Sequence, residues 1–423
     1  MFTCIVSNVS LFAEDISNII LMKVLLINSV CGQGSTGRIC VGIAEMLRKG
    51  GYIAYIAYAH GNSSYLNSFN FSGGKFDYYL HNILSRLTDS EGLHSVFATK
   101  RLIKEIESIQ PDIVHIHTMH GHYLNYKILL EYLSKKAIPI VMTLHDCWTF
   151  TGHCAHFDLR GCKEWQIECN KCEFLEEYPI SWFLDRSKRN FNLKKKLFAN
   201  IKEHLTLVPV SYWMEGLLRK SFLKGYKVHT IHNGIDLSVF KPSDFEDLYE
   251  KYKIKGRKIV LGVALPWSSY KGFSDFIKIR YSLGDEYVIL MVGVSQEQAM
   301  MLPDGIIGIE RTESPEELAK LYSMADVFVN TTYCDNYPTV NLESIACGTP
   351  VITYSTGGSP ESVDEYTGAV VEQGDVDALV KCIHNICYGS FNYKEHCLEK
   401  ALNYFDRDLC FENYLKIYNN LLG

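Results

Sequence analysis

The 423 residues contain no long apolar run and no excess of positive charge. A membrane-spanning helix needs about eighteen apolar residues in succession, and no stretch reaches that length. The longest candidates, residues 138–144 and 258–265, predict buried strands. The 42 Lys and Arg are outnumbered by 48 Asp and Glu, and the net charge of -6 argues against a dedicated nucleic-acid binder. What remains is a globular protein too long for one ordinary core, so two domains are expected.

The first 21 residues lack the basic segment of a signal peptide and contain Glu14 and Asp15. Because Met22 opens the first strand-like run, we predict that residues 1–21 are an extension, either disordered or read from a start codon placed too early. The chain has fourteen cysteines but no export signal. This pattern predicts a reduced cytoplasmic protein, in which disulfides are not expected.

Short apolar runs alternate with amphipathic segments in two series, which predicts two α/β domains with doubly wound parallel sheets. Such sheets bind ligands at the carboxyl ends of their strands, here in a cleft between the domains. The first series of strands is expected at 23–29, 53–59, 112–117, 139–144 and 205–210, and the second at 258–264, 287–294, 305–310, 326–330 and 350–354. The polar stretch 232–258 between them is interpreted as a linker. Residues 409–422 predict a final amphipathic helix.

A small-residue turn, Cys31 to Arg38, follows the first strand. Its glycines allow the backbone to approach a ligand, and the helix start favours an anion or a polar acceptor. Ser35 and Thr36 are expected to cap that helix. The loop is not a dinucleotide fingerprint, because the following strand does not end in an acidic residue. The alternative is a plain strand–turn–helix corner.

His145 and Asp146 emerge at the carboxyl end of a buried strand, where ligands bind. His145 is a candidate to hydrogen-bond a sugar hydroxyl, and the alternative is a structural His bonded to Asp146. On the preceding strand, His115 and His117 share one face and line either the same cleft or the helices.

A cysteine set follows in the insertion 147–180: Cys154, Cys162, Cys169 and Cys172. Four soft ligands in a reduced compartment are typical of structural zinc. Their spacings are unusual for a zinc ribbon, so disulfide or redox pairing and unliganded thiols are the alternatives.

Lys271 lies after the first strand of the second series, in the stretch Trp267 to Phe273. A lysine beside a helix start is well placed to neutralise a leaving diphosphate. The alternative is a solvent-facing lysine.

The stretch Asp335 to Glu361 carries two carboxylates eight positions apart and two small-residue turns. Pro338 predicts a helix start. Asp335 then lies on the loop, and Glu343 lies one turn into the helix. The amides of Tyr337, Thr339 and Val340 are expected to face the cleft. Such a unit can hold a nucleotide-linked sugar, and a solvated acidic loop is the alternative.

These motifs together resemble glycosyltransferase family 4, the retaining group with the GT-B fold, and in particular the enzymes of bacterial capsule, O-antigen (lipopolysaccharide) and colanic-acid-type polysaccharides. The resemblance covers residue 22 to the end and is carried by 335–361, 144–172, 232–236 and 240–242. It implies an acceptor-side domain at 22–236, a nucleotide-sugar domain at 237–405 and a helix at 406–423 that crosses back. The chain differs from the family in having Asp335 where the family usually has Glu, and in lacking the Arg that usually precedes Lys271.

The resemblance implies a retaining, metal-independent glycosyltransferase that uses a UDP- or GDP-sugar and a growing, lipid-linked oligosaccharide. Its catalytic residues would be His145, Lys271 and Asp335. Its donor-binding residues would be Glu343, Lys271, Tyr337, Pro338, Thr339, Val340 and Trp267, and its acceptor-side loop would be Gly34, Ser35, Thr36 and Gly37. An epimerase of the same shape and a non-catalytic sugar- or nucleotide-binding protein are the alternatives. No cofactor is required beyond the structural zinc.

A basic, aromatic-bearing stretch at residues 182–198 adds a prediction about location. Trp182, Phe183, Phe191 and Phe198 accompany Lys194, Lys195, Lys196, Arg186, Lys188 and Arg189. Such a helix face can lie on anionic lipid at the inner membrane surface of a cytoplasmic enzyme. The alternative is a solvated charged helix.

Overall fold

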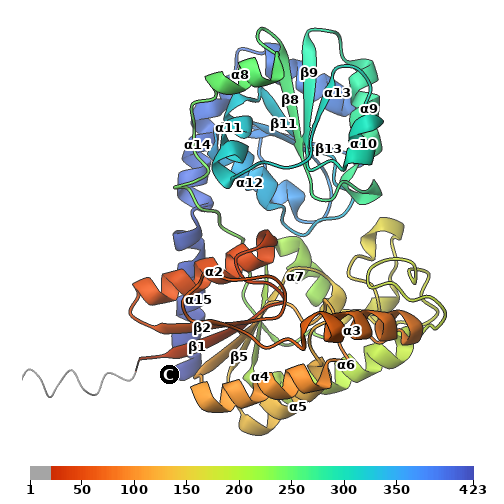
Figure 1. Cartoon of the computed structure of the whole chain (residues 1–423), viewed down its shortest axis with the longest axis vertical. Coiled ribbons are helices and arrows are strands. Elements are labelled where there is room, and N and C mark those ends of the chain that lie inside the picture. Colours follow the sequence, from red (N-terminus) through yellow and green to blue (C-terminus); the bar gives the residue numbers. More distant parts are fainter. Residues whose placement is uncertain (1–20) are drawn as a thin grey trace, which may run out of the picture.

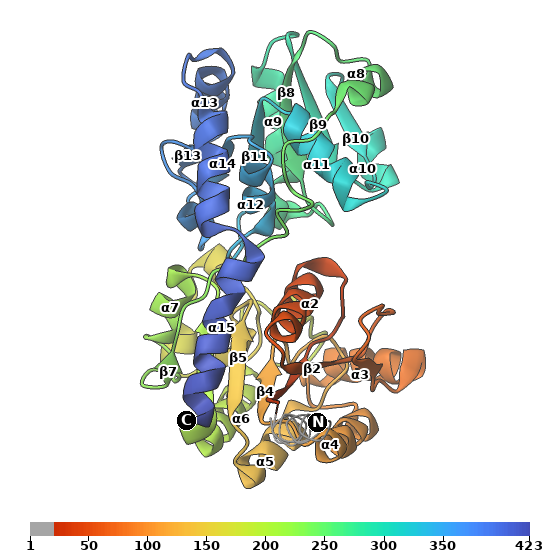
Figure 2. The ribbon, with the colours of Figure 1, turned by 90° about the vertical axis from the view of Figure 1, so that its left-hand side faces the viewer.

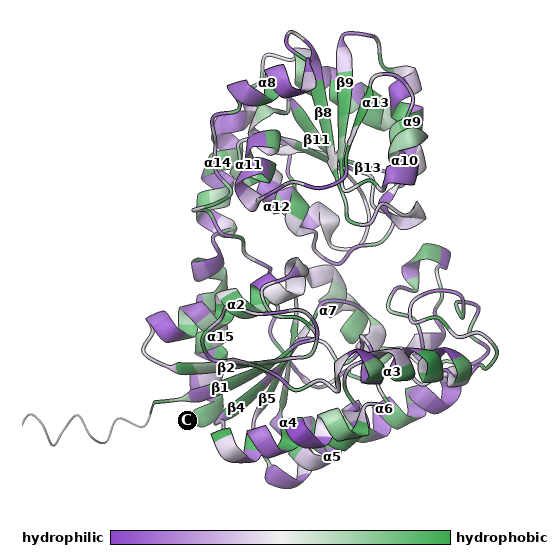
Figure 3. Ribbon diagram, viewed as in Figure 1, coloured by the Kyte–Doolittle hydropathy of each residue, from purple (hydrophilic) through white to green (hydrophobic). Residues whose placement is uncertain are grey.

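Two α/β units stacked along the long axis make up the chain (Figures 1 and 2). The structure, a computed structural model, describes residues 21–423. The predicted extension 1–21 therefore lies, except for its last residue, outside the described residues. Each unit has one sheet in which every pair of neighbouring strands is parallel. The strands of both sheets are the most hydrophobic parts of the ribbon, as expected of sheets covered on both faces (Figure 3).

The first unit contains a seven-stranded sheet of order β3-β2-β1-β4-β5-β6-β7. Its strands are β1 (Lys23–Ile27), β2 (Ile53–Tyr58), β3 (Ser68–Asn70), β4 (Ile113–Ile116), β5 (Ile140–Leu144), β6 (Leu205–Pro209) and β7 (Lys227–Val228). Its helices are α2 (Gly34–Lys49), α3 (Gly74–Thr88), α4 (Val96–Ile109), α5 (Tyr126–Lys136), α6 (Ser187–Ile201) and α7 (Tyr212–Leu218).

The second unit contains a six-stranded sheet of order β10-β9-β8-β11-β12-β13. Its strands are β8 (Lys258–Val263), β9 (Tyr287–Val292), β10 (Ile306–Ile309), β11 (Val327–Asn330), β12 (Val351–Tyr354) and β13 (Gly368–Val371). Its helices are α8 (Glu246–Tyr252), α9 (Phe273–Ser282), α10 (Gln296–Met300), α11 (Pro315–Met324), α12 (Thr339–Ala346), α13 (Val376–Tyr388) and α14 (Tyr393–Tyr404).

All ten predicted strands are present, each within two residues of the expected bounds. Three edge-region strands, β3, β7 and β13, were not predicted. They are two to four residues long and partly exposed. A short strand with one exposed face has too few apolar residues to give a clear alternation of apolar and polar positions in the sequence.

The predicted linker 232–258 is wrong as a free connection. It contains α8, and Ile235, Phe240, Leu248 and Ile254 are buried in the core of the second unit. The polar residues that suggested a linker are the solvent-facing part of a folded segment.

Helix α15 (Arg407–Leu422) begins at the second unit and packs along the first, against α2 (Figure 2). Phe411, Tyr414 and Tyr418 are buried there. The Tyr414 hydroxyl lies 2.9 Å from Thr143 Oγ1, and the Tyr418 hydroxyl lies 2.7 Å from His115 Nδ1. His115 is therefore a structural residue that faces a helix.

Candidate active site

A cleft of about 720 Å³ opens between the two units. The first unit lines it with the turn after β1 and with Ser35 and Arg38 at the start of α2, and the second with Thr339 and Glu343 of α12. Each of these residues lies at the carboxyl end of a strand or in the first turns of the helix that follows. This is the edge at which parallel sheets bind ligands.

The small-residue turn makes a tight corner that only glycine adopts easily. Gly32 and Gly34 have φ of 70° and 61°. Helix α2 begins at Gly34, and Gln33 at its N-cap makes no side-chain cap bond. The prediction that Ser35 or Thr36 caps the helix is therefore wrong, because both lie in its first turn. Thr36 instead accepts a hydrogen bond from the Asn28 side chain at 3.3 Å.

Glu343 is a buried carboxylate at the floor of the cleft. The Tyr322 hydroxyl donates to its Oε2 at 3.2 Å, and Arg38 of the other unit lies 3.8 Å from its Oε1. Burial raises the pKa of Glu343, although Arg38 and the Tyr322 hydrogen bond oppose the shift. Arg38 belongs to the predicted turn, but the sequence did not suggest its role as a cation across the cleft.

Lys271 and Asp335 form an ion pair, with Nζ 2.6 Å from Oδ2. Burial lowers the pKa of Lys271, but the charge and hydrogen bond of Asp335 outweigh it, and the net pKa is raised. Neither residue is among the described residues that line the 720 Å³ cleft. The loop before α12 connects this pair to Glu343, so the predicted donor residues form two groups joined by one segment.

Two predicted donor residues have their side chains in the core. Trp267 is buried and donates its indole N–H to the Val292 carbonyl at 2.9 Å. Tyr337 is also buried, with its ring packed 4.6 Å from that of His232. Trp267 is therefore better explained as a packing residue. Pro338 directly precedes α12 as predicted, and Thr339 reaches the cleft.

His145 stacks on His117, with the two ring centroids 5.4 Å apart. The His117 Nδ1 and His145 Nε2 atoms lie 3.1 Å apart. Burial lowers the pKa of His145 to about 4, although Asp146 opposes the shift, so the ring is neutral near pH 7. Asp146 bonds to His120 at 2.7 Å, not to His145. The interpretation of His145 as a structural partner of Asp146 is therefore wrong.

The loop before α12 also holds the two units together. The Asn336 side chain donates to the Leu144 carbonyl at 3.1 Å and accepts from the Ser211 hydroxyl. Gly358 is required beside it, because a Cβ there would lie 2.0 Å from the Asn336 carbonyl oxygen. The end of β5 and the loop before α12 thus meet in direct contact.

Glu361 makes a second connection between the units. It accepts hydrogen bonds from the amides of Tyr212 and Trp213, at 2.9 and 2.7 Å, and it pairs with His232 at 2.8 Å. These amides open α7, where a carboxylate is favoured by the helix dipole. The sequence identified Glu361 only as the end of a motif, because its partners lie about 150 residues away.

The cysteine-bearing insertion folds from three short 3-10 turns and reaches the second unit. The Cys334 thiol donates to Asp158 Oδ1 at 3.2 Å, next to Asp335. Cys154, Cys162, Cys169 and Cys172 line one cavity of about 440 Å³. These four, like the other cysteines of residues 21–423, are free thiols.

The prediction that the aromatic and basic side chains of α6 form a membrane-facing side is wrong. Phe191, Phe198 and Lys194 are all buried. Lys194 places its ammonium 3.2 Å from the centre of the Trp148 ring and donates to the Trp148 carbonyl. Burial lowers the pKa of Lys194 to about 7. None of the helices within residues 21–423 combines the length and apolar character needed to cross a membrane.

Two family descriptions match the chain. Residues 37–239 match Glycosyltransferase Family 4, and residues 244–401 match Glycosyl transferases group 1. The chain is 25% identical over 326 residues to the putative colanic acid biosynthesis glycosyl transferase WcaC of Escherichia coli K12, covering 74% of this chain and 77% of that protein.

Solved structures share the two-unit arrangement. Sucrose-phosphate synthase from Thermosynechococcus elongatus superposes with a TM-score of 0.71 at 16% identity, over 95% of this chain and 99% of that one. HepE of Anabaena, in complex with UDP and glucose, superposes with a TM-score of 0.66 at 14% identity, over 94% and 100%.

The two parallel sheets, the cleft between them and these matches define the GT-B class of two-domain glycosyltransferases. Within that class, the chain belongs to the glycosyltransferases of group 1 and family 4.

Proposed function

We propose that the protein transfers a sugar, with retention of configuration, from a UDP- or GDP-sugar to a growing oligosaccharide of a bacterial surface polysaccharide. The observation that carries this proposal is the segment 335–343, which joins the Lys271–Asp335 ion pair to the start of α12 and to buried Glu343 in the cleft. WcaC supports the polysaccharide context by its description, and HepE supports a nucleotide-sugar donor because it binds UDP and glucose.

In this proposal the ionised Glu343 accepts hydrogen bonds from the ribose hydroxyls. The Lys271 ammonium and the first amides of α12 stabilise the charge of the departing diphosphate, in place of a divalent metal. The bond between the sugar C1 and the phosphate oxygen breaks as the acceptor oxygen bonds to C1 on the same face. The acceptor proton passes to the departing phosphate oxygen. Neutral His145, from the first unit, holds a sugar hydroxyl.

A donor screen tests the proposal directly. The thermal unfolding of the full chain is measured with UDP, GDP, ADP and the corresponding nucleotide sugars. A ligand at 100 times its dissociation constant is expected to add about 2.7 kcal/mol of stability. Transfer is then followed by release of the nucleotide with and without oligosaccharide acceptors. Stabilisation by none of these nucleotides would refute the donor assignment. Release of an altered free sugar without an acceptor would favour an epimerase.

We propose further that the acceptor is lipid-linked and that α3, not α6, meets the membrane. Phe76 (79% exposed), Tyr79 and Ile83 form an apolar row on α3. Trp182 and Phe183 lie beside it, since the Trp182 amide donates to the Arg86 carbonyl. Exposed Lys75 precedes Phe76 in the sequence, and exposed Arg101 donates to the Ser72 carbonyl just before α3, on a chain of net charge -6. An apolar row flanked by cations suits the surface of an anionic bilayer.

Vesicle co-sedimentation tests this surface. The full chain should bind vesicles containing phosphatidylglycerol, and the double change Phe76→Ser with Ile83→Ser should weaken binding about tenfold or more. Tyr281→Ser, at an equally exposed aromatic of the second unit (77%), should leave binding unchanged. Binding that is indifferent to anionic lipid, or to the α3 double change, would contradict the assignment.

A further inference from the structure

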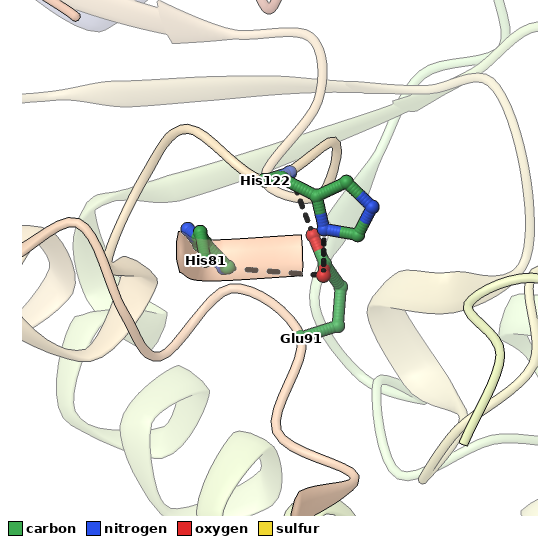
Figure 4. Close-up of side chains that lie close together, drawn as sticks. All are labelled: His81, Glu91 and His122. Atoms are coloured by element: carbon green, nitrogen blue, oxygen red, sulfur yellow. Dashed lines mark hydrogen bonds and ion pairs between the residues drawn. The ribbon is translucent and has the colours of Figure 1, made fainter. Parts of the chain in front are cut away.

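Three buried side chains from separate segments of the first unit converge beside the loop that follows β4. His81 comes from α3, Glu91 from the turn after α3, and His122 from the loop itself. Each is less than 10% exposed. Figure 4 shows the Glu91 carboxylate between the two imidazoles.

The three ligating atoms all lie within 4.8 Å of one another. His122 Nδ1 is 2.6 Å from Glu91 Oε2, and His81 Nε2 is 3.9 Å from the same oxygen. Neither Glu91 Oε2 nor His122 Nδ1 has a hydrogen-bond partner of acceptable geometry, although both are fully buried. Buried polar atoms without partners are uncommon and call for an explanation, of which a bound ion is one.

The surrounding hydrogen bonds point these atoms inward. Glu91 Oε1 accepts from the amides of Gly121 and His122, at 2.8 and 2.9 Å, which leaves Oε2 free to face the histidines. His81 Nδ1 lies 2.8 Å from Ser95 Oγ, which orients the ring with Nε2 toward Glu91. Outer contacts of this kind fix the tautomer and angle of metal-binding histidines and carboxylates. The amide of Gly92 reaches His81 Nε2 at 3.2 Å, a long contact that a metal bond would replace.

The backbone at His122 is also unusual. Its φ is 59°, a left-handed conformation that is strained for a residue with a side chain. The conformation brings its ring to Glu91.

We propose that His81, Glu91 and His122 bind one divalent transition-metal ion of the zinc class through Nε2, Oε2 and Nδ1. Two imidazoles and one carboxylate suit zinc, iron(II) and cobalt(II) better than magnesium or calcium. The alternative without metal is a buried His122–Glu91 ion pair.

The ion would position the loop that follows β4. His120 lies two residues before His122 and bonds to Asp146, at the end of β5. It also lies 2.9 Å from the Tyr178 hydroxyl through Nδ1. A metal that ties this loop to α3 and to the turn after it would hold His120 against Asp146 and Tyr178. The site is therefore structural and independent of the donor-binding residues.

Cobalt titration of chelator-treated full-length protein tests the proposal. In the protein carrying Cys169→Ser and Cys172→Ser, which removes two thiols of the insertion, one tight cobalt(II) ion should appear with visible d–d absorption and without near-ultraviolet thiolate charge-transfer bands. The midpoint of thermal unfolding should rise on addition. Glu91→Gln and His81→Asn should each weaken the binding of this ion at least about tenfold, because changes to residues that only support metal ligands already have an effect of that size. His94→Asn alters a neighbouring histidine outside the triad and should bind as wild type.

Circular dichroism and gel filtration of each variant establish that it is folded, and His122→Asn provides a third variant if one fails. If the folded Cys169→Ser, Cys172→Ser protein takes up no cobalt(II), the proposal is overturned. Equal affinity for this cobalt(II) ion with and without Glu91→Gln or His81→Asn would also overturn the proposal. In either case the triad is a buried ion pair. Nucleotide-induced stabilisation, measured in the same samples, reports separately on the donor site.

Discussion

The Lys271 ammonium lies 2.6 Å from the Asp335 carboxylate, so the proposed cation for the diphosphate is bound to the first carboxylate of the predicted donor-binding stretch. A donor must therefore compete with Asp335 for Lys271, or be held by both through its sugar and phosphate.

Lys271→Met should lower kcat about 10²- to 10³-fold, because one well-placed cation or donor at a developing charge is worth roughly 3–4 kcal/mol. The measurement is initial rate against donor concentration. Lys278→Met is the matched control, since Lys278 is an exposed lysine paired with Asp275 in the neighbouring helix. A kcat within about threefold of wild type for Lys271→Met would remove Lys271 from the mechanism.

Nucleotide affinity should depend on the ionisation of Glu343. Its pKa is raised above the ordinary 4.5 by burial, with Arg38 and Tyr322 facing it and opposing the shift. A carboxylate accepts hydrogen bonds from ribose better than a carboxylic acid does, so binding should strengthen as pH rises through this raised pKa and then level off. In the absence of ligand the sign for stability is opposite: the raised pKa favours folding at low pH, and this contribution is lost as pH rises through it.

Calorimetric titration with UDP and GDP between pH 5 and 8 measures this dependence. Glu343→Gln should bind both nucleotides weakly at every pH, and its affinity should not change with pH. If the affinity of the variant still rises with pH as in the wild type, another titrating group causes the dependence.

The Glu361 contact with α7 should contribute to the stability of the inter-unit contact. Glu361→Ala leaves the amides of Tyr212 and Trp213 without their acceptor, which costs about 1–3 kcal/mol where the donors are desolvated. Denaturant unfolding and limited proteolysis of the connection near residue 232 measure the effect. Glu365→Ala, at an exposed acid of the same segment, should change neither. A stable, protease-resistant Glu361→Ala protein would show that the other contacts suffice.

The insertion should contain zinc bound by its four cysteines, which we propose on their chemistry. The amide of Gly152 donates to the Cys169 sulfur at 3.2 Å, and a hydrogen bond from Cys154 lowers the pKa of Cys172 to about 7. Both features favour thiolates, whereas burial raises the pKa of Cys162 and Cys169, and the hydrogen bond to Cys172 together with burial raises that of Cys154. Elemental analysis should find zinc in the wild type and less in Cys169→Ser with Cys172→Ser, whereas Cys382→Ser, in the second unit, should retain it. Equal zinc content in the wild type, the double variant and Cys382→Ser would show that the four thiols are unliganded.

The periodic parts of the chain could be predicted from the sequence, and the contacts between distant segments could not. Runs such as Tyr287–Val292 are apolar throughout because parallel strands are covered on both faces, so the pattern is local. Glu343 and Lys271 were identified because a carboxylate in a helix and a lysine before one have recognisable surroundings. Arg38 opposite Glu343, and Glu361 on α7, depend on how the two units meet, and no local pattern encodes that.

Misassigned residues show the same limit at the level of single side chains. Trp267 follows a strand end, as a ligand-binding aromatic would, but its ring completes the core beside Phe276. Lys194 belongs to a run of three lysines, yet it is buried over Trp148. Composition predicts an exposed face for such residues, and only packing decides which of them turns inward.

Because α15 supplies buried Tyr414 and Tyr418 to the first sheet, the first unit is discontinuous along the chain. A ribosome that has synthesised residues 22–236 has made every strand of that sheet but not the helix that covers part of it. His115 and Thr143 then lack their tyrosine partners until about 180 more residues have been added. The amino-terminal unit should therefore remain incompletely folded during synthesis of the second, and the two units should reach their final packing together when the last helix leaves the exit tunnel.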